Sequence, residues 1–311
     1  FLGSMLDKIF STIEKGEVNQ ATEAQIINLG VSHLPDISKD YTDRNRTSPF
    51  AFTGNKFEFR AVGASANVGL PMAILNAAVA DALHESAVQL KKILEKKKSR
   101  DESVMELIRD LLKETKAVRF EGNNYSEEWQ KEAKKRGLPV LNSSVEALEV
   151  FNDPKAVEFL VNMKVLSKDE IHSRYHVAVE RYNKTLQIEL LTLNEMVQTY
   201  VVPALETQLA RSAAALDAMH GEKTKNVMQA RTTTLEKALC EALVQNEALA
   251  KGLAALSEET GESKIMKKIA SDLIPLAEKV RAAADLAERL VADDLWPLPK
   301  YREMLFSNFI S

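Results

Sequence analysis

Four amino acids that favour helices, Ala, Leu, Glu and Lys, dominate the chain from about Leu190 to Asp294. They have high helix propensities, and residues that favour strands are scarce here, so this segment is restricted to long helices. Glycines are few, and Gly221 and Gly261 fall where successive helices should turn. The pattern predicts three long helices, at about 186–219, 229–257 and 263–292.

Prolines and the C-terminal residues refine this prediction. Pro203 should kink the first long helix and Pro275 the third, because proline lacks the backbone N–H that a helix interior needs. The apolar and aromatic residues 295–306 should pack back onto the helices. Such helices could instead form a partner-binding coiled coil, but a self-contained antiparallel bundle requires fewer assumptions.

The upstream part mixes helices with strand-like segments. A helix over about 1–15 should end near Gly16, and another should begin near Pro71, which suits a first helical turn, and run to about Lys97. A capping-box spacing recurs at Ser143–Glu146 and Ser167–Glu170 and predicts two further helix starts. Further helices are expected over about 101–116 and from Ser126 to Gly137.

Charge and cysteine content exclude several classes of function. The chain has 311 residues, 41 basic and 45 acidic, and its net charge of −4 provides no bulk attraction to nucleic acid or anionic membranes. Its single cysteine, Cys240, suits a reducing cytoplasm, and its helical setting favours a small buried residue over a reactive thiol. We find no transmembrane segment or signal peptide, and we expect the start at Phe1, without Met, to reflect truncation.

A short segment after Asn55 alternates with a period of two. A strand here would place Lys56, Glu58 and Arg60 on one face, with Phe57 and Phe59 on the other. One interpretation is a half-buried strand whose charges pair with each other. The other is functional: Glu58 as a ligand of Mg²⁺ or Mn²⁺, and Arg60 as an anion clamp.

The preceding loop adds two cations to this segment. Arg44 and Arg46 could approach the same place, giving four cationic side chains and one carboxylate within 17 residues. This concentration in an acidic chain favours a polyanionic ligand such as a nucleoside triphosphate. His172 and His176 also have metal-ligand spacing, but no acid completes a known motif, and we favour a solvated helix face.

Three long segments resemble the glutamine synthetase family, most closely its large type III branch. The first, residues 45–67 (NRTSPFAFTGNKFEFRAVGASAN), has the family's arginine loop, Glu-x-Arg strand and small-residue turn. The second is residues 120–139 (FEGNNYSEEWQKEAKKRGLP), and the third is the tail, residues 295–306. The resemblance covers nearly the whole chain, and it raises the functional interpretation of the strand above the structural one.

The resemblance implies an ATP-dependent ligase that uses Mg²⁺ or Mn²⁺ to phosphorylate glutamate, after which ammonia forms glutamine. By position, Glu58 matches a metal ligand, and Arg60 an arginine that contacts the substrate carboxylate or the transferred phosphoryl group. Arg46 matches a loop arginine facing ATP phosphates, although the loop spacing differs by one residue from the better-known branch. Lys56 lies near a position where other branches have a basic residue, so it would join the ATP site. We add Arg44 to that site on its charge and proximity alone.

The resemblance also implies an architecture. We expect an α+β fold that is predominantly helical. Residues 1–190 would form the C-terminal half of a catalytic domain with few antiparallel strands, and residues 191–311 would form a bundle of long helices. Family members form ring-shaped homo-oligomers. Their other metal ligands and a flap glutamate lie upstream of the matching segment, so we expect the isolated chain to be inactive. Two alternatives stay open: a non-catalytic oligomerisation or partner-binding module, and a γ-glutamyl ligase for a larger amine.

Overall fold

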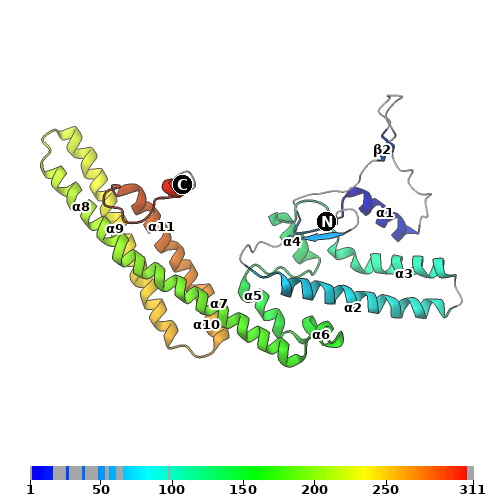
Figure 1. Cartoon of the computed structure of the whole chain (residues 1–311). Coiled ribbons are helices and arrows are strands. Elements are labelled where there is room, and N and C mark those ends of the chain that lie inside the picture. Colours follow the sequence, from blue (N-terminus) through cyan, green and yellow to red (C-terminus); the bar gives the residue numbers. More distant parts are fainter. Residues whose placement is uncertain are drawn as a thin grey trace. The chain divides into compact units, whose positions relative to one another are not determined.

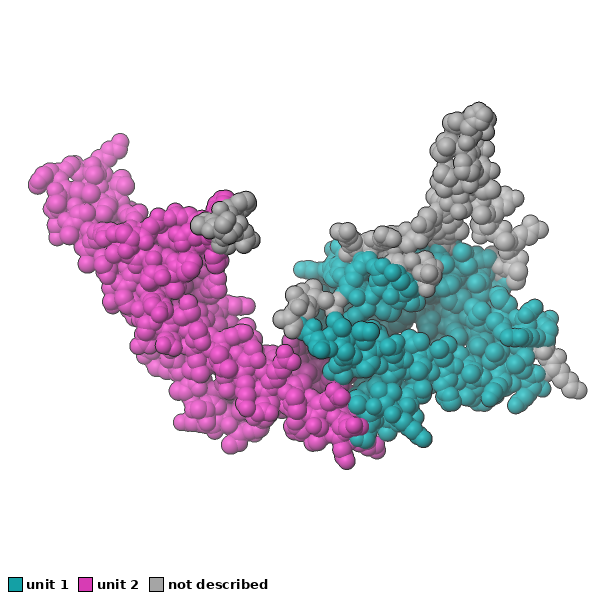
Figure 2. All heavy atoms as spheres, in the orientation of Figure 1, with its two compact units in different colours: residues 1–142, 154–167 teal, residues 143–153, 168–311 magenta. Residues whose placement is uncertain are grey.

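The computed structural model of this chain describes residues 2–16, 26–27, 37–38, 48–52, 56–60, 66–96 and 99–306. These residues divide into two compact units. Unit 1 comprises residues 1–142 and 154–167, and unit 2 comprises residues 143–153 and 168–311 (Figure 2).

Unit 1 combines helices with very short antiparallel strands (Figure 1). Strand β1 pairs with β2, and β3 pairs with β4. Helix α3 packs against α1 and α2, and α2 also contacts α6. The elements of this unit are α1 (Ser4–Lys15), β1 (Ile26–Ile27), β2 (Ile37–Ser38), β3 (Phe50–Phe52), β4 (Phe57–Phe59), α2 (Gly69–Leu94), α3 (Arg100–Glu114), η1 (Thr115–Val118), α4 (Glu127–Lys135) and α6 (Pro154–Asn162).

Helix ends in unit 1 follow local chemistry that the sequence displays. Gly16 ends α1 with a φ of 76°, a left-handed conformation that glycine adopts without strain. The Ser126 side chain accepts a hydrogen bond from the N–H of Trp129 and starts α4. Gly137 follows α4 with a φ of 75°. These three helix ends confirm the predictions made at the same residues.

Arginine side chains join the elements of unit 1. Arg109 of α3 donates from Nε to the carbonyl oxygen of Ile13 in α1 at 3.2 Å. Arg119 pairs with Glu14, and both side chains are about nine-tenths buried. Arg136 after α4 donates to the carbonyl oxygen of Arg119 at 2.8 Å. These guanidiniums cross-link helices around a small core that includes Leu107, Leu112, Ala133 and Leu160.

Unit 2 is built from long helices and short connecting elements (Figure 1). A continuous helical run from residue 168 to residue 217 packs against α9, and α9 packs against α11. The elements of this unit are α5 (Ser144–Glu149), η2 (Val150–Asn152), α7 (Lys168–Met196), η3 (Val197–Val201), α8 (Val202–Asp217), α9 (Glu222–Ser257), α10 (Glu262–Lys268), η4 (Ile269–Leu273), α11 (Ile274–Leu290) and α12 (Tyr301–Phe306).

Each predicted proline kink coincides with a wider helical turn. The π-helical turns η3 and η4 each end two residues before a proline, Pro203 and Pro275 respectively. Proline cannot donate the hydrogen bond that the carbonyl four residues earlier expects, and a π turn accommodates this gap without ending the helix. The first run therefore continues from α7 into α8.

The core of unit 2 lies along α9. Its buried side chains recur every three, four or seven residues and include Leu235, Ala238, Ala242 and Leu249. Cys240 falls between these positions and is exposed, so our expectation of a buried cysteine was wrong. The periodicity of the neighbouring apolar residues, rather than the small size of a thiol, decides its environment.

The first half of the C-terminal segment packs onto the helices, as its composition predicted, whereas the side chains of α12 are largely exposed. Leu295, Trp296 and Leu298 contact the core of unit 2. Lys300 is 8% exposed; its ammonium donates to the carbonyl oxygen of Val291 at 3.1 Å and pairs with a carboxylate oxygen of Asp293 at 2.6 Å. Across the part of the chain that the structure describes, the fold is α+β and mostly helical, as predicted, and none of its helices is long and apolar enough to cross a membrane.

Candidate functional site

The candidate site lies on the hairpin formed by β3 and β4. The two strands run antiparallel, with Ala51 opposite Glu58 and with the pairs Phe50–Phe59 and Phe52–Phe57 on either side. Directly opposed residues share a face of the hairpin, so Glu58 and Ala51 lie on one face and the four phenylalanines on the other. The alternation predicted after Asn55 is confirmed through Phe59.

The charged residues of β4 form a local group around Glu58. Atom Nη2 of Arg60 lies 3.1 Å from Oε2 of Glu58, and Nζ of Lys56 lies 3.9 Å from Oε1. Both oxygens of the carboxylate therefore face a cation. The exposed fractions of the Glu58, Arg60 and Lys56 side chains are 36%, 27% and 67%, so the group is open to solvent and only the arginine is largely covered.

Ser48 fixes the arginine end of this group. Its side chain is 2% exposed; its hydroxyl donates to the carbonyl oxygen of Phe50 at 2.7 Å and accepts the N–H of Phe50. The carbonyl oxygen of Ser48 accepts a bond from Nη1 of Arg60 at 3.4 Å, and the N–H of Arg60 donates to the carbonyl oxygen of Pro49 at 2.7 Å. Ser48 was not among the predicted site residues, although a serine before Pro49 is a recognisable turn signal.

The apolar face of the hairpin is the more exposed one. Phe50 and Phe57 stack with ring centroids 4.9 Å apart, and Phe59 meets Phe50 edge-on at 6.3 Å. These three residues are 40–52% exposed, whereas Ala51 on the charged face is fully buried. Our expectation of one apolar and one charged face is correct. In this structure, however, the backbone is buried on the charged face at Ala51, and the phenylalanine rings of the apolar face are exposed.

The described residues resume at Ala66, just before α2. The side chain of Asn67 accepts a hydrogen bond from the N–H of Gly69 at 2.7 Å, which satisfies one of the free donors at the start of the helix. A side chain at position 69 would meet this oxygen at 2.9 Å, which explains a glycine there. Asn67 therefore has a clear structural role at the end of the strand-to-helix connection.

Two of the predicted site residues, Arg44 and Arg46, lie outside the described residues. Lys56, Glu58 and Arg60 are brought together as predicted. Among the described residues, no group of three or more His, Cys, Asp or Glu side chains could hold a metal ion. Glu58 is thus a candidate for one carboxylate ligand of a metal site, and carboxylate oxygen is the ligand type that Mg²⁺ and Mn²⁺ prefer.

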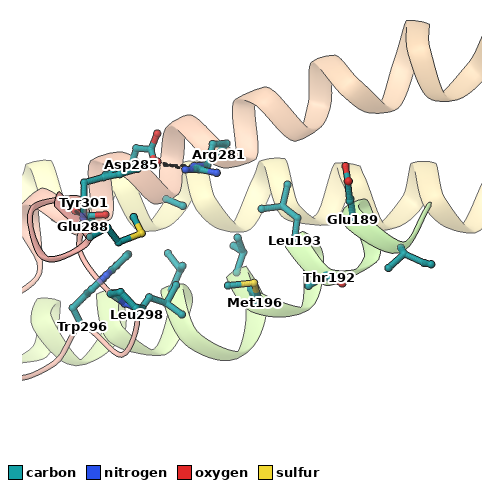
Figure 3. A pocket seen from close by; sticks show the side chains of 16 residues that line it. Glu189, Thr192, Leu193, Met196, Arg281, Asp285, Glu288, Trp296, Leu298 and Tyr301 are labelled. Atoms are coloured by element: carbon teal, nitrogen blue, oxygen red, sulfur yellow. Dashed lines mark hydrogen bonds and ion pairs between the residues drawn. The ribbon is translucent and has the colours of Figure 1, made fainter. Parts of the chain in front are cut away.

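Unit 2 contains a cavity of about 460 Å³ between α7, η3, α11 and the C-terminal segment. Figure 3 shows Leu193, Met196, Trp296 and Leu298 around its apolar part. Its polar lining holds three carboxylates, those of Glu189, Asp285 and Glu288, against the single guanidinium of Arg281. This charge balance disfavours a phosphate-bearing ligand, so we do not place a nucleotide there.

The single guanidinium of this cavity is already engaged. Nε of Arg281 donates to Asp285 at 2.9 Å, and its Nη2 lies in contact with the Tyr301 hydroxyl (Figure 3). The pKa of Arg281 is raised above its usual value, mainly by the hydrogen bond with Tyr301 and then by that with Asp285. The N–H of Tyr301 donates to Glu288 at 3.0 Å. The network joins α12 to α11 along the lining of the cavity.

Sequence comparisons relate the chain to glutamine synthetases. The model of the glutamine synthetase C-terminal domain matches residues 103–220. A glutamine synthetase of Bacteroides fragilis is 32% identical, in an alignment that covers 99% of this chain and 44% of the relative. The type-3 glutamine synthetase of Dictyostelium discoideum is 35% identical, with 98% of this chain and 42% of the relative covered.

A glutamine synthetase of Butyrivibrio fibrisolvens gives the same picture, at 30% identity with 99% of this chain and 44% of the relative covered. The chain therefore spans less than half the length of these relatives. The match to the C-terminal domain starts after the hairpin and runs across residue 190, where we placed a domain boundary. That boundary and the roles of Glu58, Arg60 and Lys56 stay predictions.

Proposed function

The chain belongs to the glutamine synthetase family, in which its relatives include a type-3 enzyme, and we propose that it supplies part of the active site of an ATP-dependent glutamate–ammonia ligase. Such a ligase phosphorylates the side-chain carboxylate of glutamate, and ammonia then displaces phosphate to give glutamine. Since the chain spans 42–44% of its relatives, the activity is proposed for a full-length protein that carries it.

The contact between Glu58 and Arg60 carries this proposal. A carboxylate and a guanidinium 3.1 Å apart, with Lys56 beside them, present one negative and two positive groups on a partly open face. Transfer of a phosphoryl group depends mainly on positioning and on neutralising charge. Arg60 would bind the substrate carboxylate or the transferred phosphoryl group through its planar fork, and Lys56 would face the ATP phosphates, with Arg44 and Arg46 joining them.

Glu58 would contribute to holding Mg²⁺ or Mn²⁺. The donor type fits, and the exposed fraction of 36% leaves the carboxylate accessible. A bound metal ion supplies charge neutralisation at the phosphate oxygens. Arg60 and Lys56 would orient the carboxylate and place positive charge next to anionic oxygens. We further propose a cytoplasmic, ring-shaped homo-oligomer, on the strength of the family relationship and the lone Cys240.

The test of the reaction uses the full-length protein with glutamate, ATP, Mg²⁺ and a panel of amines. We expect ammonia to give glutamine together with ADP and phosphate, and larger amines to give much lower kcat/KM. A higher kcat/KM with a larger amine would reassign the protein to γ-glutamyl ligases. Absence of ATP-dependent product with every amine would favour the non-catalytic module instead.

A further inference from the structure

Two histidines on α7, which the proposed reaction does not use, have converging ring nitrogens. His172 and His176 stand four residues apart, one helical turn, and both are exposed. Their Nε2 atoms lie 2.9 Å apart, and their rings meet edge-on with centroids at 4.3 Å. The two nitrogens, of a type that commonly binds metals, are thus within hydrogen-bond distance of each other, with one ring donating and the other accepting.

A buried neighbour fixes the position of His176. The ring of Tyr175 lies edge-on to His176 with centroids 5.5 Å apart, and Tyr175 is only 5% exposed. The hydroxyl of Tyr175 donates to Glu149 of α5 at 3.3 Å, and Glu149 also accepts a bond from Ser263 at 3.1 Å. One imidazole thus rests against an anchored side chain, which lowers the entropy lost when a ligand orders it.

We propose that His172 and His176 form a two-histidine binding site for a transition-metal dication. A metal–imidazole bond of about 2.0–2.1 Å places two ligand nitrogens at right angles about 2.9 Å apart. The observed separation has this value, whereas tetrahedral positions would need about 3.3 Å. Ions with square-planar or octahedral geometry, such as Ni²⁺ and Cu²⁺, therefore suit this separation, and binding would replace the hydrogen bond between the two nitrogens and turn both lone pairs towards the ion.

The chemistry of the ligands sets the selectivity. Imidazole nitrogen suits Ni²⁺, Cu²⁺ and Zn²⁺, and affinity for such sites rises towards Cu²⁺ along the divalent series. Mg²⁺ prefers oxygen ligands and should not bind here. The remaining coordination positions would hold water. Both rings would bind the ion through Nε2.

The test measures Ni²⁺ binding to the untagged chain by isothermal titration calorimetry. Ni²⁺ avoids the oxidation of the exposed Cys240 that copper would cause. We expect one Ni²⁺ site per chain. His172→Gln and His176→Gln should each weaken this site by more than about tenfold, since one imidazole cannot chelate. The matched control is His220→Gln, which alters an isolated exposed histidine.

A second readout separates binding at this site from binding elsewhere. Saturating Ni²⁺ should raise the melting temperature of the unaltered chain and of His220→Gln, because an ion that binds the folded form stabilises it. It should leave the melting temperature of His172→Gln unchanged, and Mg²⁺ should have no effect on any variant. Equal Ni²⁺ affinity in the two single variants and the unaltered chain would overturn the proposal.

Discussion

Asn194 of α7 and Asn246 of α9 exchange hydrogen bonds through their side-chain amides. Nδ2 of Asn194 donates at 3.0 Å to both the carbonyl oxygen and Oδ1 of Asn246, and Nδ2 of Asn246 returns a bond to the carbonyl oxygen of Asn194 at 3.1 Å. Asn246 is 7% exposed. Such a reciprocal pair in an apolar interface fixes the register of two helices, because sliding one helix would bury unpaired amides.

Asn246→Ala should therefore lower the free energy of unfolding of unit 2 by about 1–3 kcal/mol, since it removes two of the three hydrogen bonds and leaves the carbonyl oxygen of Asn194 without the Asn246 amide donor. Urea denaturation followed by circular dichroism measures this change. The matched control is Glu247→Ala, one residue along α9, whose pair with Lys251 is exposed and should leave the midpoint unchanged. Equal midpoints for the two variants would show that the asparagine pair contributes nothing.

Gly252 allows α9 to approach η4 closely. A Cβ atom at this position would lie 2.5 Å from Cδ2 of Leu273, which is 2% exposed. Alanine favours a helix by about 1 kcal/mol over glycine, but overpacking costs about 1–3 kcal/mol. We expect Gly252→Ala to destabilise the chain in thermal melts and to stabilise it in the Leu273→Ala background. Additive effects in this cycle would contradict the close contact.

Glu149 should make unit 2 sensitive to acid. A hydrogen bond from Asn152, and further contacts from Ser263, Lys267 and Tyr175, hold its pKa below the ordinary value of 4.5. A lowered pKa in the folded state gives stability that is complete above about 4.5 and is lost as the pH falls through the folded value.

The melting temperature of Glu149→Gln should consequently fall below that of the unaltered chain at neutral pH, and the difference should shrink under acid. Glu195→Gln, an exposed change on α7, serves as the control. A difference that stays constant down to the acid transition would mean that ionisation of Glu149 does not stabilise the fold.

Helix ends were predictable where a single residue determines them. Gly16 and the capping box at Ser143 act locally, so their sequences suffice. The capping-box spacing at Ser167 predicted a helix start there, and α7 begins at Lys168. The separate expectation of a long helix from about residue 186 divided what is one helical run through η3. Neither a glycine nor a proline interrupts that stretch, and the π turn before Pro203 keeps it continuous.

The candidate site was predictable in its composition and only partly in its surroundings. The alternation placed Lys56, Glu58 and Arg60 on one face, because every second side chain of a strand points the same way, whichever strand it pairs with. The partner strand β3 and the anchoring role of Ser48 depend on pairing between separate segments, which one short pattern does not encode. The exposure of the phenylalanine face depends on how the hairpin packs against the rest of the chain, so the alternation alone could not predict it either.

The 311-residue chain alone should show no glutamine synthesis from glutamate, ammonia and ATP. It spans less than half of its relatives, and one carboxylate cannot by itself hold the metal ions that the family uses. A coupled assay for released phosphate compares this polypeptide with the full-length protein at equal concentration. Glutamine formation above background by the chain alone would refute this prediction.

The most direct test of the proposed site is Glu58→Ala in the full-length protein, assayed for ATP-dependent glutamine formation across a range of Mg²⁺ concentrations. Glu180→Ala, which removes an exposed carboxylate paired within α7, is the matched control. The account predicts that Glu58→Ala abolishes turnover while gel filtration shows an unchanged assembly, and that Glu180→Ala retains full activity. Unchanged turnover of Glu58→Ala at saturating Mg²⁺ would contradict it.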